Sequence, residues 1–83
     1  MGRWITVSTS SGMFSSECAV SLKLADGREV SFFADKDLIK EANGKSLLKV
    51  TLVNSNLNAH KQLVLLPTET FETSTRWVEV PAE

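Results

Sequence analysis

Apolar side chains at every second position constrain the fold of this chain more than any other feature. Four of them recur early in the sequence, at Cys18, Val20, Leu22 and Leu24. This is the period of a strand that buries one face. Asp26 and Gly27 follow, and an Asp-Gly pair supplies the positive φ angles of a tight hairpin turn. Residues 29–34 are the natural returning strand, so the sequence predicts a β-hairpin here.

Further segments have the composition of short strands. Residues 3–9 alternate between polar and apolar side chains, and β-branched or aliphatic runs occupy residues 46–53, 61–66 and 75–80. About six short strands with closely spaced turns are typical of a small barrel or sandwich. We therefore predict an all-β, mostly antiparallel fold. All 83 residues are expected to form a single small barrel or two-layer sandwich, and the pattern does not distinguish an SH3-like from an OB-like arrangement.

Two segments between the strands are less regular. Residues 35–42 can form two helical turns, with Asp35 or Asp37 as the N-cap and Asn43-Gly44 at the end. We therefore expect at most one short helix, near 35–42. Residues 8–16 are rich in Ser and Gly and read as a loop. Its apolar members, Met13 and Phe14, are expected to pack inward.

Charge and cysteine content weaken several classes of function. Nine Lys and Arg against ten Asp and Glu leave a net charge of −1, whereas phosphate binding favours a basic excess, so nucleic acid is an unlikely partner. The longest aliphatic run, residues 63–66, is far too short to span a membrane, and we expect no membrane partner. The single cysteine excludes an internal disulfide and a multi-cysteine zinc site. These features favour a cytoplasmic protein.

No pattern in the sequence identifies a reaction. Cys18 and His60 are the candidates for a thiolate–imidazole pair, but Cys18 shares the apolar face of its strand and should be buried and inert. Gly44-Lys45-Ser46 lacks the earlier glycine of a phosphate-binding loop, since position 39 is Ile. The remaining candidates are carboxylates that we expect to be solvated: Asp35, Asp37, Glu69 and Glu72. We therefore assign no catalytic, cofactor-binding or metal-binding residue and expect no enzyme.

Several strands carry apolar residues on both faces. Residues 63–66, 32–33 and 47–48 place consecutive apolar side chains on opposite sides of a strand. A small barrel has one interior, so the second set must be covered by loops or lie at an interface. Tryptophan is enriched at binding hot spots. The residues that we expect at such an interface are Trp4, Phe33, Val64, Leu66 and Trp77.

These observations favour a small non-catalytic interaction or accessory domain that self-associates or binds a protein partner through its apolar strand faces. One alternative is an OB- or SH3-like nucleic-acid binder. In that case the bases of the nucleic acid would stack on Trp4, Phe32 or Phe33. Its phosphates would lie along Arg3, Lys23, Arg28 and Lys61. Another alternative is a small enzyme or ligand-binding protein with a site in the Ser/Thr-rich loops.

Overall fold

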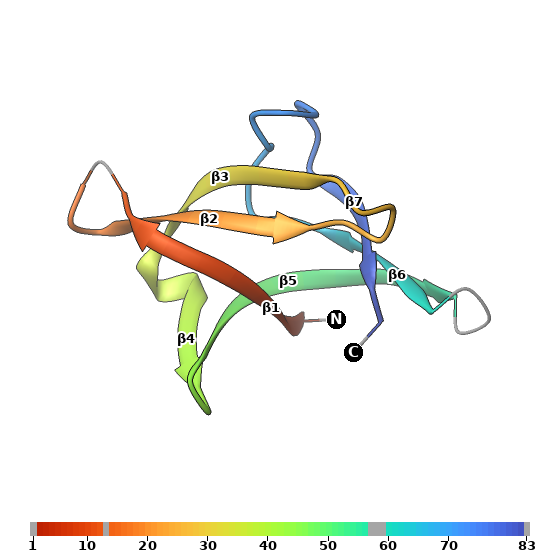
Figure 1. Ribbon diagram of the computed structural model, residues 1–83, viewed down its shortest axis with the longest axis horizontal. Coiled ribbons are helices and arrows are strands. Elements are labelled where there is room, and N and C mark those ends of the chain that lie inside the picture. The colour runs from red at the N-terminus through yellow and green to blue at the C-terminus, as the bar shows by residue number, and fades with distance from the viewer. Residues whose placement is uncertain (1, 13, 57–59, 83) are drawn as a thin grey trace.

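The alternating segments form seven strands in the computed structural model, which describes residues 2–12, 14–56 and 60–82. Their bounds are β1 (Gly2–Ser11), β2 (Glu17–Lys23), β3 (Glu29–Asp35), β4 (Ile39–Ala42), β5 (Lys45–Asn56), β6 (Lys61–Leu65) and β7 (Trp77–Pro81). The strands pair antiparallel in the order β3-β2-β1-β5-β6-β7, and β4 pairs with β5 beside this path. Figure 1 shows the sheet curled into a half-barrel, which confirms the all-β prediction.

The predicted hairpin is present as β2 and β3, which are in register from Lys23 opposite Glu29. Its turn is longer than a two-residue loop. Leu24 N–H donates to the Arg28 carbonyl at 2.8 Å, so residues 25–27 form the turn. Gly27 (φ 91°) has the positive φ in this turn, whereas Asp26 does not. This is the pattern of a type I turn completed by a left-handed glycine, so our expectation of positive φ at both residues was wrong.

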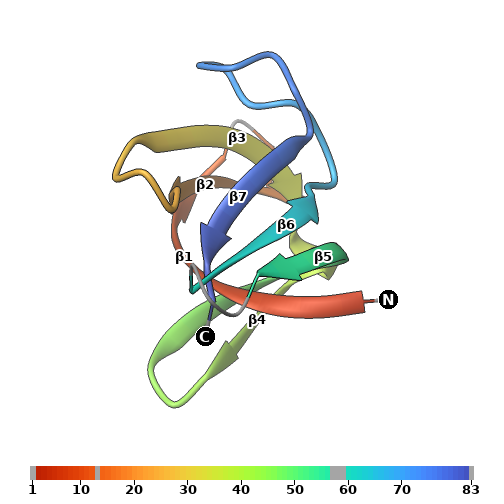
Figure 2. The same cartoon turned by 90° about the vertical axis from the view of Figure 1, so that its right-hand side faces the viewer.

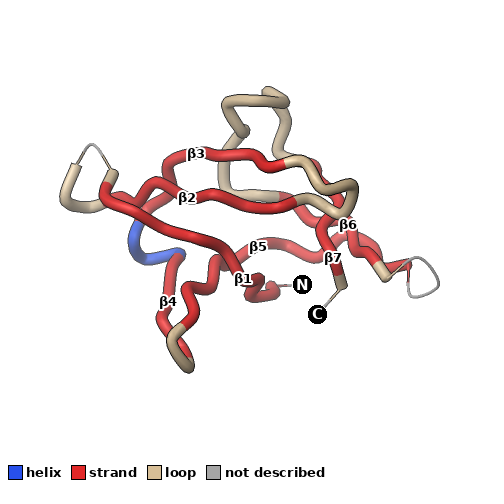
Figure 3. The backbone as a smooth tube through the Cα atoms, viewed as in Figure 1, coloured by secondary structure: helices blue, strands red, loops and turns tan. Residues whose placement is uncertain are grey.

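Residues 35–42 do not form the expected helix. Asp35 does cap a turn, since its side chain accepts a hydrogen bond from the Asp37 N–H at 3.1 Å, but that turn is a single 3-10 element, η1 (Lys36–Leu38). Figure 3 shows it as the short segment between β3 and β4. Asn43 (φ 53°) and Gly44 (φ 77°) then join β4 to β5. Asn-Gly strongly favours a two-residue hairpin turn, and pairing with β5 outweighs weak helix signals.

One cluster of buried side chains fills the interior of the curled sheet. It contains Ile5, Val7, Val20, Leu22, Leu24, Val30, Phe32, Ala34, Leu48, Val50, Val64, Leu66, Val78 and Val80. Leu38 and Ile39 pack against it, so the segment after β3 does cover part of the core. Phe14 does not pack inward as expected, because it is 68% exposed. Met13 lies outside the described residues.

Contacts outside the strand ladders occupy backbone groups at the two ends of the sheet. At the outer edge of β3, the Ser31 carbonyl accepts from the Phe71 N–H at 2.9 Å. At the edge of β7, the Glu79 carbonyl accepts from the Ala25 N–H at 2.9 Å. Figure 2 shows the segment between β6 and β7 rising above β3. These bonds reduce the number of free backbone groups that another strand could pair with.

The β4–β5 turn gives a direct test of the fold. Gly44→Ala is expected to lower the free energy of unfolding by about 1 kcal/mol, because a Cβ disfavours the left-handed conformation. Urea denaturation of both proteins measures the difference. Gly2→Ala is the matched control, since a Cβ there would meet Lys49 Cε at an ordinary 3.5 Å. Equal losses in the two variants would contradict the assigned turn.

Candidate interaction surface

The structure separates the five residues predicted at an interface into outward and inward sets. Val64 and Leu66 are each 0% exposed and belong to the core, so they are not accessible to a partner in this fold. Leu63 and Leu65 occupy the opposite face of β6 and are half-buried. The sequence correctly indicated a strand with two apolar faces, but the predicted interface residues Val64 and Leu66 lie on its inward face.

Trp77, on the terminal strand β7, is an exposed apolar residue on the outer surface. It is 53% exposed and sits directly opposite Leu65, which in turn sits opposite Thr51 of β5. Val53, in the irregular stretch of the β5–β6 ladder, is 45% exposed. We call the outward face formed by Val53, Leu63, Leu65 and Trp77 the Trp77 surface. It extends over three adjacent strands, β5, β6 and β7.

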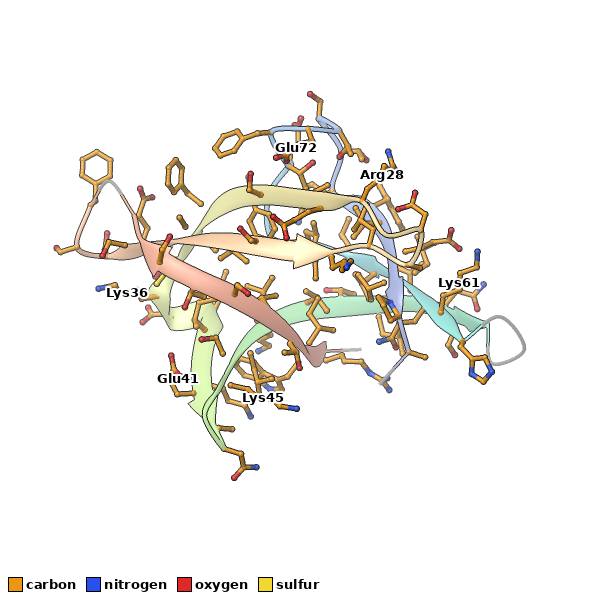
Figure 4. All side chains as sticks on the ribbon, viewed as in Figure 1. Arg28, Lys36, Glu41, Lys45, Lys61 and Glu72 are labelled. Carbon is orange, nitrogen blue, oxygen red and sulfur yellow. The ribbon has the colours of Figure 1, made fainter. Side chains whose placement is uncertain are left out.

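A cleft of about 590 Å³ borders the Trp77 surface, where the β2–β3 turn approaches β7. Leu63 and Trp77 contribute to its apolar lining, together with Leu24, Ala25 and Val78. Thr73 and Thr75, from the loop before β7, also line it. Two ion pairs stand at its rim: Asp26–Arg28 at 2.7 Å and Lys61–Glu79 at 3.8 Å. In Figure 4, Arg28 and Lys61 both lie toward this end of the molecule. The cleft is therefore apolar at Leu63 and Trp77 and nearly neutral in charge at its rim.

Trp4 and Phe33 are engaged elsewhere. The Lys40 ammonium lies 4.2 Å from the centroid of the half-buried Trp4 ring, a cation–π contact that covers part of the indole. Phe33 is half-buried on β3 and contacts Phe71 edge to face, with ring centroids 5.5 Å apart. Both side chains lie on the outer face of their strands, but the structure does not join them with Trp77 into one patch.

The candidate catalytic residues are not brought together. Cys18 is half-buried rather than fully buried as expected. It lies near the beginning of β2, whereas His60 precedes β6, and Figure 1 shows these strand beginnings at opposite ends of the molecule. Among the described residues, no group of three His, Cys, Asp or Glu side chains is placed to hold a metal ion. Gly44-Lys45-Ser46 lies at the β4–β5 hairpin turn and the start of β5.

Glu72 has a structural role that the sequence did not reveal. Its carboxylate accepts hydrogen bonds from the Ser31 N–H at 2.7 Å and from the Ser31 hydroxyl at 2.8 Å. Figure 4 shows Glu72 above β3. The Ser31 N–H, and then its hydroxyl, favour the charged carboxylate and lower the Glu72 pKa. Because 41 residues separate the partners, no local pattern predicts this contact.

Comparisons with known proteins return no match to a family model, a curated protein or a solved structure. No helix in the described part of the chain is long and apolar enough to cross a membrane. The assignment of function therefore depends on the surfaces described above.

The contact between Glu72 and Ser31 predicts a pH-dependent contribution to stability. A carboxylate whose pKa is lowered by folding stabilises the protein above its ordinary pKa of 4.5, and this contribution is lost as the pH falls through the lowered value. Glu72→Gln is therefore expected to be less stable than the parent at pH 7. The difference should shrink below a pH of about 4.5.

Urea denaturation at pH 7 and pH 3 measures this difference. Glu69→Gln, in the same loop, is the control, because Glu69 is exposed and forms no hydrogen bond with the residues that the structure describes. A Glu72→Gln difference that stays constant between the two pH values would contradict the role assigned to the carboxylate.

Proposed function

We propose that this protein is a non-catalytic interaction domain that binds a protein partner, a second copy of itself in the simplest case, through the Trp77 surface. The observation that carries this proposal is the exposure of Trp77, at 53%, beside three other apolar side chains on adjacent strands. A contiguous apolar patch on a soluble domain marks an interaction site more often than scattered exposed residues do. Tryptophan is also among the residues that contribute most to binding energy.

The backbone of β7 favours contact through side chains over the addition of another strand. The Trp77 N–H already donates to the Thr75 hydroxyl at 3.2 Å, and the Glu79 carbonyl is bound by Ala25. Pro81 has no N–H to offer. An edge with so few free groups is a poor template for strand addition. A partner at this end of the sheet therefore gains most by covering Trp77 and Leu63.

The placement of the cations supports an interaction domain over a nucleic-acid binder. Arg28 and Lys61 are paired with Asp26 and Glu79. Arg3 donates from Nη1 to the Gln62 side-chain oxygen at 2.9 Å. Phe32, one of the expected stacking residues, is 1% exposed and lies in the core. Phosphate binding would have to compete with these contacts, and Phe32 could not stack on a base.

Self-association through the Trp77 surface predicts a mass near twice 9.1 kDa in solution. Light scattering on a sizing column, over a range of concentrations, measures this mass. Trp77→Ser is expected to restore the monomer, because it removes the largest exposed apolar side chain of the surface. Phe14→Ser is the matched control, since Phe14 is also an exposed aromatic residue but lies between β1 and β2.

A monomeric parent protein requires a second measurement. Binding of a hydrophobic dye that Trp77→Ser abolishes and Phe14→Ser preserves would support the same surface as the site for a different protein. A monomer whose dye binding does not depend on Trp77 would refute the proposal.

A further inference from the structure

A second aromatic surface lies on the outer face of β2 and β3, away from the Trp77 surface. Phe33 projects outward from β3, and Phe71 packs against it edge to face at an interplanar angle of 77°. Phe71 is nevertheless 65% exposed. The pair therefore presents aromatic surface to solvent. The pair is not part of the core, because Phe33 is only half-buried and Phe71 lies outside the core cluster.

Backbone and side-chain hydrogen bonds hold Phe71 in this position. Its N–H donates to the Ser31 carbonyl, and the next residue, Glu72, binds Ser31 through both carboxylate oxygens. Thr70, which is 3% exposed, accepts from the Thr73 N–H at 3.0 Å and fixes the turn that follows. The exposed ring is thus presented by an ordered loop, and Glu72 places a negative charge beside it.

A second negative region borders the other side of the aromatic pair. Glu17 and Asp35 are directly opposite each other across the β2–β3 ladder and share the outward face with Phe33. Neither carboxylate forms an ion pair with any residue that the structure describes. Like charges directly opposite each other on two strands are destabilising. Gly12 lies close to Glu17, since a Cβ on Gly12 would be 2.8 Å from Glu17 Cγ.

We propose that this face binds a basic segment of a partner protein. A lysine or arginine side chain would lie over the Phe33–Phe71 pair, with its charge between Glu72 and the Glu17–Asp35 pair. Aromatic faces attract such cations, and nearby carboxylates strengthen the attraction. Charge complementarity selects this occupant. An apolar segment would leave the carboxylates of Glu17 and Asp35 without a cation, although Asp35 also accepts a hydrogen bond from the Asp37 N–H, and an acidic segment would be repelled. This surface is independent of the one proposed for the general function.

Hexa-arginine is a suitable probe, with hexa-glutamate as the charge control. Amide chemical shifts of the isotope-labelled protein, recorded at low ionic strength, report where the peptide binds. We expect hexa-arginine to shift the amides of Glu17, Phe33, Asp35, Phe71 and Glu72, and hexa-glutamate to leave them unchanged. Added salt should weaken the binding. Shifts spread over all acidic residues alike, or centred elsewhere, would overturn the proposal.

Two variants separate recognition from folding. Phe71→Ala is expected to weaken hexa-arginine binding about three-fold through loss of the cation–π contact. Glu17→Gln is expected to weaken it by a similar factor, about three-fold, yet to raise the stability of the free protein because it relieves the repulsion from Asp35. Weaker binding by a more stable protein cannot result from unfolding. Unchanged binding in both variants would overturn the proposal.

Trp77→Ser is the control that separates this proposal from the one for the Trp77 surface. We expect this variant to bind hexa-arginine as the parent does, whatever its own oligomeric state. The two proposals can therefore fail separately: loss of self-association or dye binding tests the Trp77 surface, and loss of peptide binding in Phe71→Ala tests the β2–β3 face. Equal loss of peptide binding in Trp77→Ser and Phe71→Ala would refute a site centred on Phe33 and Phe71.

Discussion

Strand β5 holds the curled sheet together through both of its edges. One edge pairs with β1, from Ser46 to Thr51, and the other pairs first with β4 and then with β6. All the described strands therefore join to one 12-residue element, either directly or through one or two intervening strands. A sheet of this size that curls around β5 encloses a single interior. Apolar side chains on the outward side of the same strands cannot enter it, and the Trp77 surface follows from this restriction.

The two edges of the sheet are partly covered by hydrogen bonds, whereas parts of its outer faces stay exposed. At β3, Ser31 is bound by Phe71 and Glu72, and at β7 the Glu79 carbonyl is bound by Ala25. These contacts occupy backbone groups that would otherwise attract another strand. The outer faces receive no such cover over Trp77 and Phe71, which stay more than half exposed. The molecule therefore limits association through its edges while leaving aromatic side chains available on its faces.

Alternation in the sequence was enough to predict the class of fold, because strands that bury one face repeat every second residue. It could not assign the faces of β6. The run from residue 63 to 66 contains no polar residue that marks an outward side. The nearest polar residue in phase with Val64 is Gln62, which is itself buried, at 2% exposure, and bound by Arg3. The position of Phe71 could not be predicted from the sequence either, since it depends on a contact with Ser31, 40 residues earlier in the sequence.

The two exposed aromatic side chains at the proposed surfaces, Trp77 and Phe71, are not part of the core that holds the fold together. Trp77 and Phe71 lie outside the core cluster, and the loop that carries Phe71 is fixed by backbone bonds and by the buried Thr70. Truncation of either aromatic side chain therefore removes little buried area, and substitutions at exposed positions usually change stability by less than about 0.5 kcal/mol. Folding alone gives no reason for large aromatic residues at these two positions. Under the two proposals, contact with other molecules accounts for their exposure, and the neutral rim of one surface and the acidic border of the other correspond to occupants of different charge.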